Sequence, residues 1–321
     1  MSNKKIIQTA LQTIQLQADA ISKLKGFINA DFERALEAIA ASNGRLVISG
    51  IGKSAIIAKK IVATFNSTGT PAVFMHAADA IHGDLGIVQP EDIIILISKS
   101  GDSPEIKALV PLIKNFGNVL IGMVGNLDSF LASQSAIILN TTVAQEACPN
   151  NLAPTTSTTA QMVMGDALAI CLMELKGFTS VDFAKFHPGG ALGKRLFLKV
   201  SELAAQNEMP MVTAETSIRE VIVEMTNKRL GVTAVVNSNK EVEGIITDGD
   251  LRRMLEKMES FETLQAKDIM SKDPLTVEEN LLAAAALEIM KSKNISQLIV
   301  AKGNIYTGVI HIHDILKEGI I

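Results

Sequence analysis

Five short apolar segments constrain the fold of this 321-residue chain more than any other feature of its sequence. Such runs are typical of parallel strands that are buried on both faces. Stretches with helical periodicity lie between them, at about 54–67, 104–115 and 128–133, and a long helix is expected over 158–175. The alternation predicts an α/β fold with a doubly wound parallel sheet and right-handed crossovers. The expected strands are 46–49, 72–75, 93–97, 119–124 and 137–139.

The last third of the chain repeats itself at an offset of 63 to 64 residues. Thr213–Glu215 is echoed by Thr276–Glu278, and Gly244–Leu251 is echoed by Gly308–Ile315. Two copies of a helix–strand–strand–helix unit explain this pattern. We therefore expect a second, α+β region built from a tandem repeat. The expected domains are 1–200, 206–262 and 266–321, with the polar stretch 205–208 as the linker.

Charge and composition argue against several classes of function. The formal net charge is −4, and the basic clusters are isolated pairs such as Arg252-Arg253, so nucleic acid is not expected as a partner. The apolar runs are far shorter than the roughly 20 residues that span a bilayer, so no membrane partner is expected. The start of the chain lacks the apolar run of a signal peptide. Two cysteines form neither a disulfide framework nor a zinc knuckle, which favours a reducing cytoplasm.

Two loops have the composition of anion sites. In Ser49–Ser54, Gly50 and Gly52 allow a tight turn, and Lys53 and Ser54 open the next helix, but the spacer of a nucleotide-binding Walker loop is missing. In Ser98–Ser103, three hydroxyl groups surround one glycine at a helix start. They suit the oxygens of a phosphate monoester. Both loops follow strands, and ligands bind at the carboxyl ends of strands in doubly wound sheets. A plain strand-to-helix turn remains an alternative for the first loop.

Three further segments carry polar groups that suit catalysis. The segment Gln145–Thr159 ends in five consecutive hydroxyl residues, of which one or two are explained as helix caps. His82 and His187 each lie in a glycine-rich segment. A single histidine is usually structural, but two in separate glycine-rich loops suggest proton transfer.

Taken in order, these motifs resemble a sugar isomerase (SIS) domain followed by a tandem CBS pair, and more narrowly the arabinose 5-phosphate isomerases. The resemblance covers the whole chain. Each string is weak evidence alone, but their order is highly specific. The strings are Gly50–Ser54, Ala63–Pro71, His82–Gly86, Glu146–Pro149 and His187–Gly193.

The resemblance implies reversible conversion of D-ribulose 5-phosphate and D-arabinose 5-phosphate, the supply step for the acidic sugar Kdo of lipopolysaccharide and some capsules. It implies a small-molecule sugar phosphate as ligand, no cofactor, and a homo-oligomer, with a tetramer favoured. The family's phosphate loop corresponds to Ser98, Ser100 and Ser103. Lys99 departs from the family pattern, in which a small polar residue is common, and it either strengthens phosphate binding or points to solvent. The family's functional positions correspond to Lys53, His82, Glu105, Glu146 and His187.

We interpret the mechanism as proton transfer between C1 and C2 through a cis-enediol, for which one carboxylate suffices. Glu146 is the first choice for this base and Glu105 the second. Lys53 stabilises the enediolate or holds the phosphate. The remaining expected roles are proton transfer between sugar oxygens for His187 and hydroxyl orientation for His82. The chemistry requires no metal, although His82 with Asp84 is a weak candidate for one.

In the CBS pair, Thr247 and Asp250 match the hydroxyl and carboxylate with which many relatives bind adenine nucleotides. The second copy keeps Asp314 but has His311 in place of the hydroxyl. A nucleotide or sugar nucleotide is therefore one expectation, and a purely structural role in assembly is the other. Two alternatives for the whole chain are a non-catalytic SIS sensor of a sugar phosphate and an SIS enzyme acting on a hexose or amino sugar phosphate.

Overall fold

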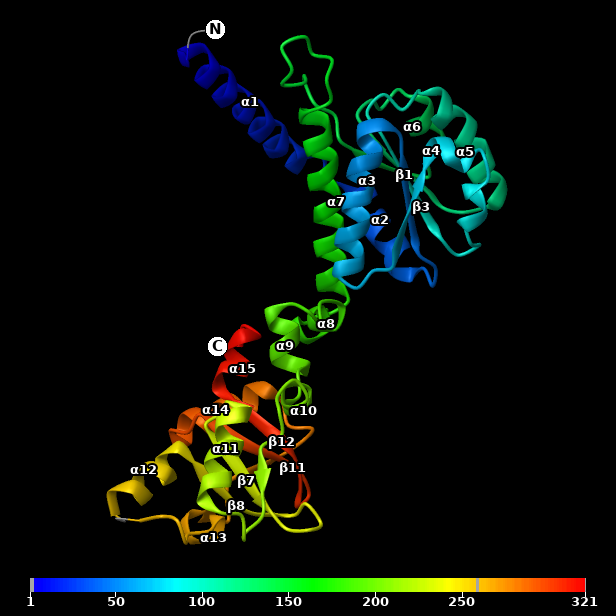
Figure 1. The fold of residues 1–321 in the computed structure, drawn as a ribbon. Coiled ribbons are helices and arrows are strands. Elements are labelled where there is room, and N and C mark those ends of the chain that lie inside the picture. The colour runs from blue at the N-terminus through cyan, green and yellow to red at the C-terminus, as the bar shows by residue number, and fades with distance from the viewer. Residues whose placement is uncertain (1–2, 258–259, 321) are drawn as a thin grey trace. The chain divides into compact units, whose positions relative to one another are not determined.

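The computed structural model describes residues 3–257 and 260–320 (Figure 1). They form two compact units, the first ending at Phe186 and the second beginning at His187. Each unit has its own sheets and its own hydrophobic cores.

The first unit is built on a parallel sheet of five strands in the order β2-β1-β3-β4-β5. This confirms the predicted α/β class and the doubly wound topology. The chain runs from β1 to β2 on one side of the sheet and returns to β3 on the other side of β1. The switch point of the sheet therefore lies at the carboxyl ends of β1 and β3. The strands are β1 (Leu46–Gly50), β2 (Ala72–His76), β3 (Ile93–Ser98), β4 (Leu120–Val124) and β5 (Ile137–Asn140).

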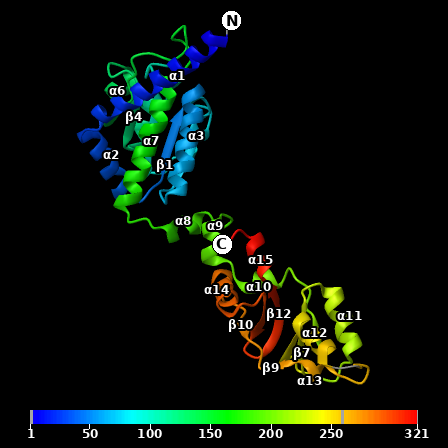
Figure 2. The same ribbon diagram turned by 90° about the vertical axis from the view of Figure 1, so that its left-hand side faces the viewer.

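Helices cover both faces of this sheet. Successive residues of a strand point to opposite faces, so Ile48 packs into the core beneath α3 and α7, whereas Val47 packs into the core beneath α5. Figure 2 shows α7 in front of the sheet, between α2 and α3. The first face carries α1 (Asn3–Leu24), η1 (Lys25–Phe27), α2 (Ala30–Ala41), α3 (Gly52–Ser67), α7 (Thr156–Leu175) and α8 (Ser180–Phe186); the second carries α4 (Ala77–Ala80), η2 (Asp84–Ile87), α5 (Pro104–Phe116) and α6 (Phe130–Gln134).

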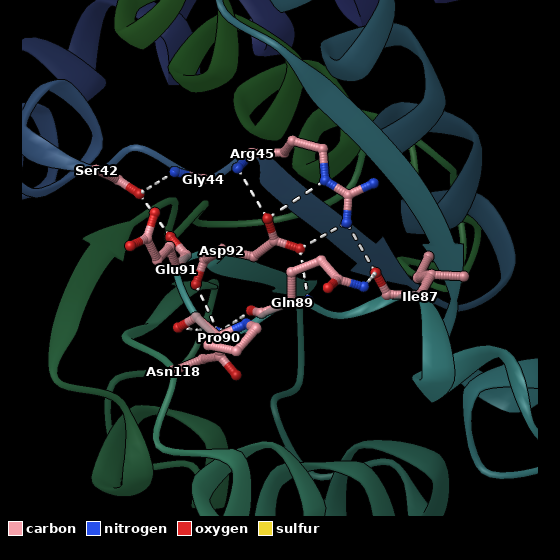
Figure 3. A network of polar contacts seen from close by, with 9 residues as sticks. All are labelled: Ser42, Gly44, Arg45, Ile87, Gln89, Pro90, Glu91, Asp92 and Asn118. Carbon is pink, nitrogen blue, oxygen red and sulfur yellow. Dashed lines mark hydrogen bonds and ion pairs between the residues drawn. The ribbon is translucent and has the colours of Figure 1, made fainter.

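A polar network ties together the amino-terminal edge of the sheet (Figure 3). The buried carboxylate of Asp92 accepts hydrogen bonds from the guanidinium of Arg45, at 2.8 Å from its terminal nitrogen, and from the backbone N–H groups of Arg45 and Gln89. Burial raises the pKa of Asp92, but these hydrogen bonds outweigh it and hold the pKa below its ordinary value. Gly44 lies so close to the backbone of Glu91 that a Cβ at this position would stand 2.2 Å from the Glu91 carbonyl oxygen. This network anchors the edge opposite to the carboxyl ends of the strands.

The second unit contains the predicted repeat. Each copy runs helix–strand–strand–helix, and each antiparallel pair carries an irregularity at an equivalent place, at Val235/Val236 and Val300/Ala301. One sheet has the order β6-β7-β8-β9 and the other β10-β11-β12. The elements of the two copies are β6 (Met211–Val212), α11 (Ile218–Lys228), β7 (Val232–Val236), β8 (Val242–Thr247) and α12 (Asp248–Lys257), then β10 (Thr276–Glu278), α14 (Ala283–Lys293), β11 (Gln297–Lys302), β12 (Ile305–His311) and α15 (Ile312–Lys317).

Short helices before each copy pack into the opposite copy. Val200 and Leu203 of α10 (Val200–Ala204) are buried in the core of the second copy, and Ala266 of α13 (Ala266–Ile269), which precedes β9 (Ser271–Lys272), is buried in the core of the first. Helix α9 (Ala191–Phe197) also belongs to this unit.

The unit boundary after Phe186 therefore differs from the expected boundary at 200, because α10 is part of the second unit's core. The stretch 205–208 is not a free linker either: Asn207 Nδ2 donates to the carbonyl of Val309 and to Asp314. Across the described part of the chain, no helix combines the length and apolar character needed to cross a bilayer.

Candidate active site

Three loops meet at the carboxyl edge of the first unit's sheet. They follow β1, β3 and β5, and two contacts link these loops or the helices that they lead into. Ser54 Oγ, in the first turn of α3, donates to Gln161 Oε1 of α7 at 3.1 Å. Lys99 Nζ, in the loop after β3, lies 2.8 Å from Glu146 Oε1 in the loop after β5. The structure thus brings the predicted loops together at the switch point of the sheet.

The loop after β1 leaves a helix start open to solvent. Gly52 has φ of +56°, in the left-handed region that favours glycine. No side chain in the described part of the chain caps the start of α3, so its first N–H groups are free to bind an anion. Lys53 is exposed beside them and has no ionic or hydrogen-bonding partner among the described residues.

The serine loop, 98–103, is held by its own hydroxyl groups. Ser98 Oγ accepts from the N–H of Gly101 at 3.0 Å, and Ser103 Oγ caps α5 by accepting from Ile106 N at 3.4 Å. Ser100 Oγ accepts from Asp102 N at 3.4 Å. Because each oxygen accepts, each hydroxyl proton remains available to donate to a ligand. Such an arrangement suits a phosphate group.

Gly101 is required in this loop for two reasons. Its φ of +71° lies in the left-handed region, and a Cβ there would stand 2.2 Å from Ser129 Oγ. The serine loop therefore packs tightly on the residues before α6.

Glu146 is buried, and its carboxylate is saturated with donors. Its side chain has no exposed surface. Besides Lys99, it accepts from Ser157 Oγ at 2.5 Å, from Thr155 N at 2.8 Å and from Ser157 N at 3.2 Å. Burial alone raises the pKa of this carboxyl group, but hydrogen bonds from Lys99, Ser157 and Thr155 outweigh it and lower the pKa from 4.5 to about 2.

The carboxylate of Glu146 therefore acts as the cap of α7. It accepts hydrogen bonds from backbone N–H groups at the helix start. The side chain of Thr155, which stands at the cap position, does not bind them. This is why α7 begins at Thr156 rather than at the expected 158. A weakly basic carboxylate without exposed surface argues against Glu146, our first choice, as the proton shuttle.

Glu105 is the better placed of the two acids. It lies in the first turn of α5, directly after the cap Ser103, and it is half-buried. Within 3–257 and 260–320 its carboxylate has no hydrogen-bonding or ionic partner. It is therefore available to a substrate that is bound by the serine loop.

The two predicted histidines lie in different parts of the chain. His82 is exposed in the turn after α4, and no contact in the described structure links its side chain to the three loops. His187 belongs to the second unit. His82 and Asp84 also lack a third ligand, since the described residues contain no group of three or more His, Cys, Asp or Glu side chains that could hold a metal ion.

The structure adds residues that the sequence did not single out. Ser49 Oγ at the end of β1 and Thr156 Oγ1 at the start of α7 are buried hydroxyl groups without a hydrogen-bond partner in the described chain. The run of hydroxyl residues before α7 was the available signal, but it did not distinguish a capping hydroxyl from a free one. Lys99 does not simply point to solvent, because its ammonium pairs with the carboxylate of Glu146.

In the second unit, Thr247 and Asp250 bind each other. Asp250 Oδ2 accepts from Thr247 N at 2.8 Å and from Thr247 Oγ1 at 2.6 Å, while Oδ1 pairs with Arg253 at 2.6 Å. Burial raises the pKa of Asp250, but these contacts lower it overall. A cavity of about 410 Å³ lies between the two copies and is lined by Asp248, His311 and other residues, but not by Thr247 or Asp250.

Comparisons with known proteins identify the family of this chain. The SIS domain model matches residues 39–171, and the CBS domain model matches 200–257 and 266–320. Proteins named arabinose 5-phosphate isomerase KdsD from Yersinia pestis and Pseudomonas aeruginosa are each 44% identical to this chain. The alignment with the Yersinia pestis protein covers 98% of this chain and 96% of that protein. The alignment with the Pseudomonas aeruginosa protein covers 99% of this chain and 98% of that protein.

Among solved structures, Escherichia coli CFT073 c3406 in complex with arabinose 5-phosphate is 39% identical, with a TM-score of 0.57. The match covers 59% of this chain and 100% of the solved chain. The near-complete alignments with full-length relatives include both the SIS domain and the CBS pair. The chain therefore belongs to the arabinose 5-phosphate isomerase family.

Proposed function

We propose that this protein is an aldose–ketose isomerase that interconverts D-ribulose 5-phosphate and D-arabinose 5-phosphate, at the first step of Kdo biosynthesis. The observation that carries this proposal is the meeting of three polar loops at the switch point of the sheet. They combine a serine-rich anion site with the carboxylate of Glu105, which has no partner among the described residues. The relatives named arabinose 5-phosphate isomerase align over both domains, and the solved relative is a complex with arabinose 5-phosphate.

The phosphate is bound at the serine loop and the adjacent helix starts. Ser98, Ser100 and Ser103 donate their hydroxyl protons, and the N–H groups at the start of α3, near Gly52 and Ser54, add further donors. The buried free hydroxyl of Thr156 supports an anion site that includes the start of α7.

Glu105 transfers the proton. In the ketose it takes a proton from C1 while O2 gains one, which gives the cis-enediol; it then returns a proton to C2 while O1 loses one, which gives the aldose. The absence of a partner for its carboxylate within the described structure supports this role, whereas the saturated carboxylate of Glu146 supports a role as an anchor. Lys53 stabilises the negative charge of the enediolate. His187 and His82 keep their predicted roles, in proton transfer between sugar oxygens and in orientation of a hydroxyl.

The decisive experiment is conversion of ribulose 5-phosphate in deuterated water, followed by NMR. Glu105→Gln should lower kcat by about 10²- to 10⁴-fold and abolish deuterium incorporation at the sugar carbon. Glu146→Gln should retain exchange in the folded fraction, and Glu174→Gln, an exposed glutamate on α7, is the matched control. Exchange at the wild-type rate in Glu105→Gln overturns the choice of base.

The same assay separates the alternatives for the whole chain. A non-catalytic sensor binds arabinose 5-phosphate in calorimetry but yields no product. An enzyme for another sugar phosphate turns over a hexose or amino sugar phosphate faster than ribulose 5-phosphate.

The protein acts as a homo-oligomer, with a tetramer favoured. Ile7, Leu11 and Ile14 form an apolar stripe on α1 that is more than half exposed. Figure 1 shows that this half of the helix extends away from the sheet. A stripe of this kind supports burial against another copy of the chain. We place the enzyme in the cytoplasm, where sugar phosphates are formed, and cell fractionation tests this.

The cleft between the CBS copies binds a regulatory ligand, for which a nucleotide or sugar nucleotide is our proposal. The 410 Å³ cavity with its polar lining supports it, and the mutual hydrogen bonds of Thr247 and Asp250 favour a capping role for those two residues. Thermal-shift screening tests this proposal. A stability unchanged by every nucleotide and sugar nucleotide favours a role in assembly alone.

A further inference from the structure

Lys99 occupies a place in the serine loop that the mechanism does not yet use. It stands between Ser98 and Ser100, and its backbone is fixed, because the N–H of Gly125 donates to the carbonyl oxygen of Lys99 at 3.1 Å. The neighbouring β4 end is so close that a Cβ on Gly125 would stand 2.8 Å from that oxygen. The starting point of the Lys99 side chain is therefore well defined.

The side chain leads from this loop to Glu146. Its ammonium lies 2.8 Å from Glu146 Oε1, whose side chain has no exposed surface, whereas the Lys99 side chain is 44% exposed. An ammonium carries three N–H donors. The contact with Glu146 uses one donor, and the described structure shows no other partner for the group. The ammonium is thus held on one side by a buried anion, while the Lys99 side chain stays partly open to solvent.

Electrostatics keep the ammonium in this position. The pKa of Glu146 is lowered to about 2, so its carboxylate remains charged at neutral pH. Backbone N–H groups of Thr155 and Ser157 already offset part of that negative charge. The ammonium of Lys99 and the start of α5 therefore leave the loop attractive to a dianion.

We propose that Lys99 is a substrate-binding residue whose ammonium is positioned by Glu146 to donate two hydrogen bonds to the phosphate of the sugar. This inference rests on the proposed function and extends it, because it adds a charged side chain to a phosphate site otherwise made of hydroxyl and N–H groups. It also gives Glu146 a second task, since the buried carboxylate holds the lysine side chain in one orientation before the substrate arrives. Such pre-organisation reduces the entropy lost on binding.

The test is the affinity of the full-length protein for phosphate. Lys99→Met should weaken competitive inhibition by inorganic phosphate, and raise KM for arabinose 5-phosphate, by about 10- to 100-fold, because a hydrogen bond to a charged group is lost. The kcat should change little, since the lysine does not contact the reacting carbons. Lys99→Arg should recover most of the affinity. Lys114→Met, an exposed lysine at the far end of α5, is the control for loss of one positive charge.

A purely structural role gives a different result. Lys99→Met also removes the cation beside Glu146, so the double variant Lys99→Met with Glu146→Gln removes both charges together. If phosphate inhibition returns to the wild-type value in the folded double variant, Lys99 serves only as a counterion and the inference is overturned. Unchanged inhibition by phosphate in Lys99→Met overturns it as well. Wild-type protein that fails to form arabinose 5-phosphate refutes the proposed function instead, and phosphate binding measured by calorimetry still tests Lys99.

Discussion

Replacing Glu146 by glutamine should destabilise the first unit even where no substrate is present. The carboxylate accepts from the ammonium of Lys99, from Ser157 Oγ and from two backbone N–H groups at the start of α7. Glutamine is uncharged, and its amide nitrogen is a donor that would face other donors. The variant therefore loses the charge-assisted hydrogen bonds and leaves buried N–H groups without an acceptor.

The pKa of Glu146 gives the magnitude. A lowering from 4.5 to about 2 corresponds to about 3 kcal/mol of stability at neutral pH, at about 1.4 kcal/mol for each pKa unit. Because the folded-state pKa is below the unfolded one, this contribution is complete above pH 4.5 and is lost as the pH falls toward 2. The difference in unfolding free energy between wild type and Glu146→Gln should therefore shrink on acidification.

The assay is urea unfolding of the full chain followed by circular dichroism, between neutral pH and about pH 3. Hydrogen exchange of a peptide that covers the start of α7 reports the same loss locally. Glu174→Gln, an exposed glutamate on the same helix, should change stability by less than about 0.5 kcal/mol. If Glu146→Gln is as stable as wild type at neutral pH, or if the two differ by a constant amount at every pH, the capping role is refuted.

Three further predictions follow from the same structure. Asp92→Ala should cost about 3 kcal/mol of unfolding free energy, because Arg45 and two backbone N–H groups lose a buried acceptor; denaturant unfolding measures it. Gly101→Ala should weaken phosphate inhibition and destabilise the first unit by about 1 to 3 kcal/mol, since a Cβ at φ of +71° meets Ser129, and an unaltered inhibition constant would contradict this. Leu11→Glu should dissociate the oligomer in light scattering while the circular dichroism spectrum stays unchanged, because this side chain is 63% exposed on α1.

Local patterns predicted most of the architecture. The apolar runs became five parallel strands because their residues are buried on both faces, as shown by Ile48 and Val47 in opposite cores. The sequence repeat at 63 to 64 residues corresponds to the two similar copies within the second unit. The boundary between the units lies earlier than expected. A linker is predicted from local polarity, but Val200 belongs to the second unit because it is buried in a core formed by residues much later in the chain.

The roles of the two glutamates show the limit of the sequence. Glu146 lies in a loop and Glu105 in the first turn of α5, but both stand in segments whose composition suits catalysis, so the sequence did not decide between them. The pKa of a carboxyl group depends on the donors around it, and those of Glu146 come from positions 99, 155 and 157, which only the folded chain brings together.

By itself, the sequence determined the fold class and the repeat, and it predicted which loops have the composition of an anion site, because hydrophobic periodicity and turn residues act over short distances. Only the tertiary structure decided that Lys99 pairs with Glu146 and that, within the described residues, Glu105 remains unpaired. Electrostatic and hydrogen-bonding partners are set by proximity in space, and the switch point of the sheet places loops from distant strands side by side.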